Sequence, residues 1–404
     1  MSARAVSLDP RDPRFVQDPY PAYQELRQRL PVFHWHEMGH WCFAKHDDVA
    51  ALLRDRRFGR QILHLASREE LGWPEPAAHL APFLAFERHS LLELEPPSHT
   101  RLRALVNRPF LNRIGEGLRP SLARIAEECL DSLPKEGEWD LIERYATPIP
   151  VRAITHVLGV PDEIGPRMLA WSHDMIAMYQ ARRDAGIERA AVRATEEFSS
   201  CIRDLLDQRR GSAGQDLVSE LLRSEVGGER LSDDELVTTA MLFLIAGHEA
   251  TVHAIGNGVR AVLESGLDSR AAFAEPADCA SAIEELLRFD APLHLFTRFA
   301  LEDCEVAGVT LRRCETIGLL LGSANRDAAR FEEPERLDPA RSPNPHVSFG
   351  GGLHFCLGAP LARLELQAAF RVLFRRMPQL HLVGEALFRD TYHFRGLERL
   401  IVRG

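Results

Sequence analysis

The stretch Phe349-Gly350-Gly351-Gly352-Leu353-His354-Phe355-Cys356-Leu357-Gly358 decides the fold of this 404-residue chain. Its glycines let the backbone turn tightly and approach a ligand closely. A helical pattern follows at once over residues 359–366. Cys356 is therefore expected at a helix N-terminus, where unpaired N–H groups and the helix dipole favour an anion. Such a setting favours the thiolate, which is the form of cysteine that binds metals.

A lone thiolate suits haem better than zinc. Structural zinc sites use four ligands, whereas haem iron accepts one axial thiolate, which favours cleavage of an O–O bond. The alternative is a small buried cysteine, which is common in proteins. The pattern F-G-x-G-x-H-x-C-x-G around Cys356 favours the haem ligand, because it resembles the haem-binding signature of the cytochrome P450 family of haem-thiolate monooxygenases at every fixed position.

Composition narrows the function classes. The net charge is −10, which argues against a nucleic-acid partner, since such proteins present a basic face. The seven cysteines are scattered and odd in number, which fits a reducing cytoplasm better than a disulfide framework. We see no signal peptide and no uncharged apolar run of membrane-spanning length, so we expect a cytoplasmic protein without a membrane anchor.

The periodicity predicts a mainly α-helical protein with small peripheral β-sheets, built as a single domain over residues 1–404. We expect its longest helix to begin at the capping box Ser232–Glu235 and run as one rod to about Ser265, with an apolar centre. Residues 61–95 are expected to be irregular. This layout resembles the cytochrome P450 fold. No dinucleotide-binding or iron–sulfur pattern is visible, so no fused reductase or ferredoxin module is predicted.

Two residues on a short predicted helix, Glu285 and Arg288, are three positions apart. Such a pair is usually a weak surface ion pair. Here it resembles the E-x-x-R motif of the family, and Arg336 occupies the place of the arginine that completes a buried Glu–Arg–Arg network. The resemblance implies a structural role for these three residues.

The resemblance also implies a haem-binding set. Cations for the haem propionates are expected at His99 and Arg103, which share one helical face, and at Arg298 and His354, because guanidinium groups match carboxylates well. For each cation alone, a solvated side chain is the simpler alternative. Cys356 is the expected metal ligand, and the remaining expected cofactor-binding positions are Phe349, Gly350, Gly358 and Ala246.

The sequence Ala246-Gly247-His248-Glu249-Ala250-Thr251 interrupts the apolar helix with a carboxylate, which is costly to bury unless it is used. It resembles the oxygen-activation motif of the family, which implies that Gly247 gives dioxygen or substrate access and that Glu249 belongs to a proton relay. The chain departs from the motif, because Ala250 holds the usual position of the alcohol. Thr251 follows one residue later, about 100° around the helix. We expect water and Thr251 to serve; a substrate hydroxyl or an atypical reaction are the alternatives.

A substrate pocket of apolar and aromatic side chains is expected, which suits a lipophilic small molecule. Each member could equally be plain core: Phe83, Phe86, Leu91, Leu92, Leu242, Ala246, Leu293, His294 and Phe296. A basic surface for an acidic ferredoxin is expected from five arginines, although scattered surface arginines are an equal alternative: Arg101, Arg108, Arg113, Arg363 and Arg375.

The resemblance spans residues 10 to 400 and implies a monooxygenase that binds haem b (iron protoporphyrin IX) and O2. NAD(P)H would supply electrons only through partner proteins, a reductase with a ferredoxin or flavodoxin. Three alternatives remain: a haem-thiolate peroxygenase or isomerase that needs no external electrons, a non-catalytic haem-based sensor, and a zinc protein, for which no second ligand cluster is seen.

Overall fold

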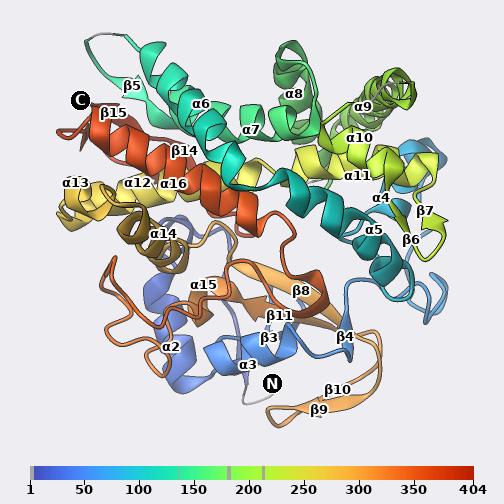
Figure 1. Ribbon diagram of the computed structural model, residues 1–404. Coiled ribbons are helices and arrows are strands. Elements are labelled where there is room, and N and C mark those ends of the chain that lie inside the picture. Colours follow the sequence, from blue (N-terminus) through green and yellow to red (C-terminus); the bar gives the residue numbers. More distant parts are fainter. Residues whose placement is uncertain (1–3, 135, 180–182, 212–213) are drawn as a thin grey trace. The chain divides into compact units, whose positions relative to one another are not determined.

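The computed structural model describes all residues except 1–3, 135, 180–182 and 212–213. The chain divides into two compact units (Figure 1). Unit 1 comprises residues 1–66, 122–149 and 250–404, and unit 2 comprises residues 67–121 and 150–249. Cys356 belongs to unit 1, and most of the long apolar segment before Glu249 belongs to unit 2.

Unit 1 contains a mixed sheet that combines strands from residues 5–59 with two strands from residues 295–320. Leu319 of the central strand pairs with Phe43 on one side in parallel and with Phe296 on the other side in antiparallel register. The sheet therefore joins the N-terminal strands to the region just before the Cys356 turn. Its order is β1 (Ala5–Val6), β2 (Val32–Trp35), β3 (His40–Phe43), β11 (Thr316–Leu320), β8 (Leu295–Ala300) and β4 (Phe58–Gly59).

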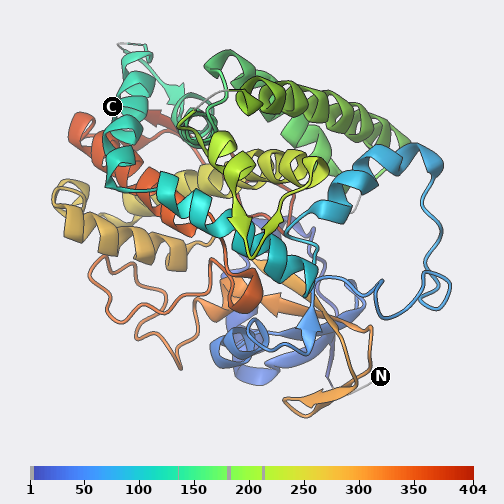
Figure 2. The same ribbon diagram turned by 45° about the vertical axis from the view of Figure 1, so that its right-hand side comes forward.

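Smaller sheets complete the β-structure of unit 1. One hairpin, which projects from the six-stranded sheet in Figure 2, consists of β9 (Cys304–Val306) and β10 (Val309–Leu311). A three-stranded sheet has the order β12 (His381–Leu382), β15 (Ile401–Arg403) and β5 (Trp139–Asp140). The last pair is β13 (Leu387–Phe388) with β14 (Leu397–Arg399).

The helical core of unit 1 packs around the C-terminal helix α16 (Ala359–Arg376). Phe273 lies against Phe370 and Phe374 of α16, with ring centroids 5.1 and 5.2 Å apart. The other helices of this unit are α1 (Pro13–Gln17), α2 (Tyr20–Arg29), α3 (His46–Leu52), most of α6 (Arg119–Asp131), the π-helix η3 (Ile142–Ala146), α12 (Glu249–Ser265), α13 (Ser269–Ala272), α14 (Pro276–Phe289), α15 (Leu321–Ala324) and the short η6 (Gly352–His354).

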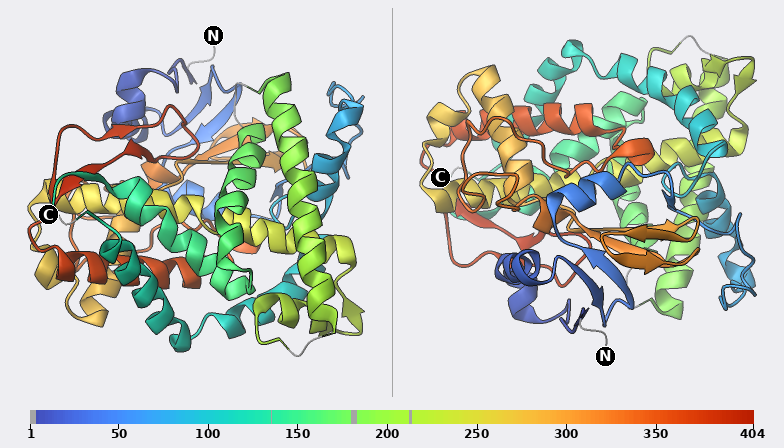
Figure 3. Two further views of the ribbon diagram at one scale, coloured as in Figure 1. Left: turned by 90° about the horizontal axis from the view of Figure 1, so that it is seen from above. Right: turned by 90° about the horizontal axis from the view of Figure 1, so that it is seen from below.

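Unit 2 is almost entirely helical. The long helix α9 (Ala185–Arg210) lies beside α8 (Gly165–Ile176), as the left view of Figure 3 shows, and Trp171 stacks near Phe198 at 5.1 Å between ring centroids. The remaining elements are η1 (Ala78–Leu80), α4 (Ala81–His89), α5 (Ser98–Arg113), η2 (Glu116–Leu118), most of α7 (Pro148–Leu158), η4 (Asp162–Ile164), η5 (Ala177–Tyr179), α10 (Leu217–Arg223), the hairpin β6 (Glu225–Val226) and β7 (Glu229–Arg230), and α11 (Asp233–Ala246).

Two expectations about local structure were wrong. Residues 61–95 contain α4, whose buried face consists of Phe83 and Phe86 and whose first turn holds a proline, a residue that helices accept there. The expected rod from Ser232 begins with the predicted capping box, but it is interrupted at Gly247 and His248, so α11 and α12 are separate helical segments. The predicted apolar centre is confirmed, since residues 236–245 are all buried.

Within the described residues, the segment Asp233–Ser265 is long and apolar enough to cross a membrane. Of the most apolar 18-residue window in this segment, 78% is buried inside the protein, and the core helix of a globular protein has the same property.

Candidate functional site

The Cys356 turn is built by hydrogen bonds and by glycines in positive-φ conformations. The N–H of Cys356 donates to the carbonyl of Phe349 at 3.0 Å, and α16 begins three residues later with Gly358 as its N-cap. Gly352 has φ +64°, and a Cβ there would lie 2.4 Å from the Leu53 carbonyl oxygen, so only glycine fits. Cys356 itself is exposed, whereas the other six cysteines are buried or half-buried.

The expected ring at Phe349 holds the turn against α16. The guanidinium of Arg363 lies 4.5 Å from the ring centroid of Phe349. Arg363 also donates to both oxygens of Glu284 at 2.7 and 2.8 Å, and Nε2 of His346 lies 3.1 Å from Glu284. Burial of Glu284 opposes its ionisation, but these two partners lower the pKa of the carboxyl to about 2. This cluster, which the sequence did not indicate, fixes α14, α16 and the turn together.

Glu285 and Arg288 form the predicted buried pair. Arg288 donates to the two carboxylate oxygens at 2.7 and 2.8 Å, and both residues are at most 1% exposed. Arg288 also donates to the carbonyls of Asn325 and Pro334 at 2.9 Å, which ties the loop before the Cys356 turn to α14.

The third member of the network is Arg341, so the prediction of Arg336 was wrong. Arg341 donates from Nε to both oxygens of Glu285 at 3.1 and 3.0 Å. The side chain of Arg336 is 62% exposed and pairs with Glu333 and Asp338. Only its backbone carbonyl takes part, as an acceptor for Arg288 and Arg341. The loop carries two arginines, and the turn at Asp338, whose N–H donates to Glu285, directs the later one inward.

The four predicted cations are divided between the units. Arg298 lies in β8 of unit 1, is 4% exposed and donates to the Thr297 carbonyl at 2.8 Å. His354 ends η6, two residues before Cys356. In unit 2, the first turn of α5 carries His99, which is 1% exposed, and Arg103 follows one turn later and is half-buried. A buried arginine and a histidine two residues before Cys356 are a donor set that suits a ligand bearing carboxylates.

The interruption between α11 and α12 coincides with the predicted oxygen-activation motif. Ala246 is exposed although the ten residues before it are buried, so the helix becomes accessible at this point. A Cβ at Gly247 would lie 2.3 Å from the Phe243 carbonyl oxygen, which explains the glycine. Glu249 and Ala250 are half-buried and Thr251 is buried. The motif therefore lies where the buried helix is interrupted and its surface becomes accessible.

Sequence reasoning missed Glu365, a carboxyl on α16 that is 0% exposed. Neither of its oxygens forms a hydrogen bond within the described part of the chain. Burial raises the pKa of Glu365 well above its usual range, which favours its protonated, uncharged form. The Thr251 hydroxyl opposes part of this rise, although it does not reach full hydrogen-bond geometry with either oxygen. A glutamate on the core face of the C-terminal helix was the available signal.

Some of the predicted substrate residues lie in unit 2 and others in unit 1, and one of them, His294, is a core residue. Phe83, Phe86, Leu91 and Leu242 are buried in unit 2, where Leu92 is 48% exposed. Leu293 and Phe296 are half-buried in unit 1. His294 is wrongly placed by the prediction: its ring is 1% exposed, packs on Gly322 and lies 3.0 Å from the hydroxyl of Tyr23. Burial, together with the charge of Arg395, lowers the pKa of His294 to about 3, so it is a neutral core histidine.

The arginines proposed as a basic surface are mostly neutralised. Arg101 pairs with Glu235, Arg113 with Glu220, and Arg375 with Glu127. Arg363 is committed to Glu284. These pairs reduce the positive charge that an acidic partner would meet.

Comparisons with known proteins agree with this geometry. Residues 280–378, which include Glu285, Arg288 and Cys356, match the family described as cytochrome P450. The polyketide biosynthesis cytochrome P450 PksS of Bacillus subtilis is 34% identical and covers 98% of both chains, and its solved structure matches with a TM-score of 0.87. The vitamin D(3) 25-hydroxylase of Pseudonocardia autotrophica is 39% identical over 96% of this chain and 94% of its own.

A further solved structure, P450BioI in complex with an acyl carrier protein that bears hexadec-9Z-enoic acid, is 31% identical with a TM-score of 0.88 and covers 97% of this chain and 100% of its own. The matches extend over nearly the whole chain and include enzymes named as hydroxylases. The predicted mainly helical fold and the predicted family are thus confirmed. The chain belongs to the cytochrome P450 family of haem-dependent monooxygenases.

Proposed function

We propose that this enzyme hydroxylates a lipophilic small molecule in the cytoplasm with electrons that a ferredoxin or flavodoxin delivers from NAD(P)H. The observation that carries the proposal is the Cys356 turn, an exposed thiol at the start of α16 in a turn where only glycine fits. Seven free cysteines support a reducing compartment. Hydroxylases among the relatives support the reaction class.

Haem b fits the donor set of the site. Within unit 1, Cys356 would supply the single thiolate, and Arg298 and His354 would donate to its propionate groups. His99 and Arg103 stay propionate-binding predictions from the resemblance. When bound, the haem supplies the binding and activation of O2 and the oxidation of a C–H bond. The protein keeps Cys356 in place through the Glu284–Arg363 pair and the Glu285–Arg288–Arg341 network.

Proton delivery is assigned to Glu249, Thr251 and Glu365. Glu365 holds its proton in the core, and the Thr251 hydroxyl beside it can pass a proton on, since a hydroxyl both donates and accepts. The methyl group of Ala250 leaves the usual alcohol position without a donor. Ala250→Thr should raise the amount of product per NAD(P)H consumed. Unchanged rate and coupling would contradict a shortage of donors at this position.

The expected substrate residues are apolar, which favours a lipophilic substrate. The names of the relatives above mention polyketide biosynthesis, vitamin D(3) and hexadec-9Z-enoic acid on an acyl carrier protein. Compounds of these three kinds are lipophilic. Polyketides, sterols and long-chain fatty acids therefore form the first substrate panel. A substrate-induced change of the haem spin state identifies binders before turnover is measured.

The experiment that tests the proposal compares two electron sources on the same panel. Turnover with NADPH, ferredoxin and reductase, and little with peroxide alone, is the expected result. Turnover with peroxide alone would instead support the second candidate, a haem-thiolate peroxygenase, which Ala250 at the alcohol position favours. Absence of turnover by either route would contradict both.

A further inference from the structure

Three of the five tyrosines of this chain gather in one cluster of unit 1, in which Tyr23 is buried and Tyr20 and Tyr392 are half-buried. Tyr20 and Tyr23 lie on α2 with ring centroids 6.1 Å apart. The hydroxyls of Tyr23 and Tyr392 are hydrogen-bonded at 3.0 Å. Trp35 lies beside Tyr392, with centroids 5.3 Å apart. Readily oxidised side chains therefore form a continuous group with van der Waals or hydrogen-bond contacts.

Two of these phenols have a base as partner. Tyr20 donates to Oδ1 of Asp290 at 2.6 Å, and the guanidinium of Arg395 holds the pKa of Asp290 below its usual range although burial opposes this. The Tyr23 hydroxyl lies 3.0 Å from Nδ1 of His294, whose Nε2 faces Asp290 at 3.9 Å. The Tyr23 hydroxyl donates to the Tyr392 oxygen, and rotation of its hydrogen turns it to Nδ1 of His294, which accepts when the ring nitrogen that faces Asp290 carries the imidazole hydrogen. Burial raises the pKa of both phenols, so an oxidised ring would lose its proton to these bases rather than to water.

The cluster is connected to the Cys356 turn by packed rings. The position of a Cβ on Gly350 lies 3.2 Å from Phe296, so this ring touches the turn. Phe296 lies 6.3 Å from His393 between ring centroids, and Tyr392 is the adjacent residue. The backbone N–H of His294 donates to the His393 carbonyl at 3.2 Å, which holds this segment against β8. All of these residues belong to unit 1.

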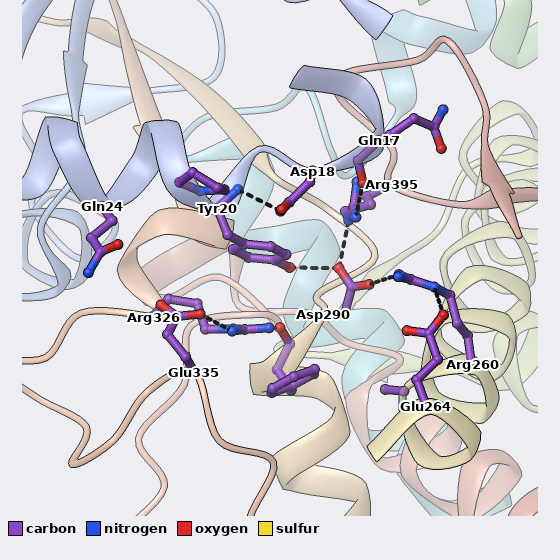
Figure 4. Close-up of a pocket in the computed structure, with 13 residues that line it drawn as sticks. Gln17, Asp18, Tyr20, Gln24, Arg260, Glu264, Asp290, Arg326, Glu335 and Arg395 are labelled. Atoms are coloured by element: carbon purple, nitrogen blue, oxygen red, sulfur yellow. Dashed lines mark hydrogen bonds and ion pairs between the residues drawn. The ribbon is translucent and has the colours of Figure 1, made fainter. Parts of the chain in front are cut away.

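The other end of the cluster reaches a cavity of about 450 Å³. Figure 4 shows Tyr20 on its wall with its hydroxyl directed to Asp290, and Arg326 and Arg260 on either side. Exposed residues, Pro21, Gln24 and Glu335, line its rim, so the cavity opens to solvent. A small soluble molecule can therefore approach Tyr20.

We propose that Tyr23 and Tyr20 form a relay that carries an oxidising equivalent from a haem held by Cys356 to this cavity, where a soluble thiol quenches it, and that Tyr392, packed between Tyr23 and the ring contacts to the turn, supports the first transfer. The relay rests on the proposed function, because it needs the haem. It protects the enzyme when no substrate consumes the oxidising equivalent.

Each step balances in electrons and protons. Hydrogen peroxide, reduced to water, would withdraw two electrons from the haem-loaded enzyme, and Tyr23 would return one of them while its phenolic proton moves to Nδ1 of His294. Tyr20 then reduces Tyr23, the proton of Tyr20 moves to Asp290, and Tyr23 regains its proton from His294. A thiol in the cavity gives one electron to Tyr20, which regains its proton from Asp290, while the thiol proton passes to the solvent. A second passage returns the second electron, and the two thiyl radicals combine to a disulfide.

The test is freeze-quench electron paramagnetic resonance of the haem-loaded protein mixed with hydrogen peroxide. We expect an organic radical that narrows when the protein contains ring-deuterated tyrosine, and that decays faster when glutathione is added. Tyr23→Phe should lower its yield several-fold, and Tyr20→Phe should slow its quenching by glutathione. Both variants should also bleach haem several-fold faster.

The matched control is Tyr145→Phe, because Tyr145 is equally buried but donates to a peptide carbonyl, that of Ala369, and not to a base. It should match the wild type. No tyrosyl radical in the wild type, or one that persists in Tyr20→Phe, Tyr23→Phe and Tyr392→Phe, would overturn the relay. The ferrous–CO spectrum of each sample separates the two claims: absence of a thiolate-ligated haem refutes the proposed function, whereas a normal spectrum without the radical refutes the relay alone.

Discussion

Glu285 on α14 and Glu365 on α16 are both 0% exposed in the same unit, yet their surroundings are opposite. Glu285 accepts hydrogen bonds from Arg288, Arg341, Asn344 and the N–H of Asp338. Glu365 has no hydrogen-bond partner in the described part of the chain and holds a proton. The first carboxylate fixes the loop before the Cys356 turn. Glu365 holds no other segment in place. Its burial without a hydrogen-bond partner favours its protonated form, so it can serve as a proton donor.

The largest effect is expected from Glu285→Ala. It leaves Arg288 and Arg341 as buried charges without their carboxylate, which costs about 3–5 kcal/mol in the free energy of unfolding. Urea unfolding at pH 7 measures the change, and the haem content should fall because the loop before Cys356 loosens. A decrease of less than about 1 kcal/mol in the free energy of unfolding would show that the network does not hold the loop in place.

Glu284→Gln should have the next largest effect on the free energy of unfolding, and this effect should depend on pH. The pKa of Glu284 is lowered to about 2, so the unfolded chain binds its proton first as the pH falls. The stabilisation is full above pH 4.5 and is lost between pH 4.5 and 2, with an upper limit on the order of 3 kcal/mol. Unfolding free energies of both proteins should therefore converge on acidification. A difference that stays constant from pH 7 to pH 3 would contradict the ion pair with Arg363.

Arg341→Ala tests the corrected assignment of the third network member, with Arg336→Ala as its matched control five residues away. The first variant removes a buried partner of Glu285 and should cost about 2 kcal/mol. The second removes a side chain that is 62% exposed and should cost less than about 0.5 kcal/mol. Equal losses in urea unfolding would restore Arg336 to the network.

Glu365→Gln should give the smallest change, and one of the opposite sign. In the wild type, folded Glu365 keeps a proton that the unfolded chain releases above pH 4.5, so this group destabilises the fold as the pH rises. The variant lacks this penalty, and its stability relative to the wild type should rise by about 1 kcal/mol between pH 5 and pH 6. No pH dependence of that difference would mean that Glu365 is ionised or solvated.

The contrast between the two carboxylates also shows what the sequence can predict. The Cys356 turn, the Glu285–Arg288 pair and the capping box at Ser232 depend on residues close in sequence, and all three were predicted. Whether Arg336 or Arg341 turns inward depends on the path of the loop, and the partners of His294 come from α2 and the C-terminal segment. For Glu365, its place on the core face of α16 was the available signal, but the lack of a hydrogen-bond partner for its oxygens is a property of packing that leaves no sequence pattern.

Cys356 as the haem ligand is the central claim, and the ferrous–CO difference spectrum of the purified protein tests it most directly. The account predicts the strongly red-shifted Soret band of a thiolate-ligated haem in the wild type and its loss in Cys356→Ser. A spectrum typical of histidine ligation, no haem at all, or a red-shifted band that persists in Cys356→Ser would contradict the account.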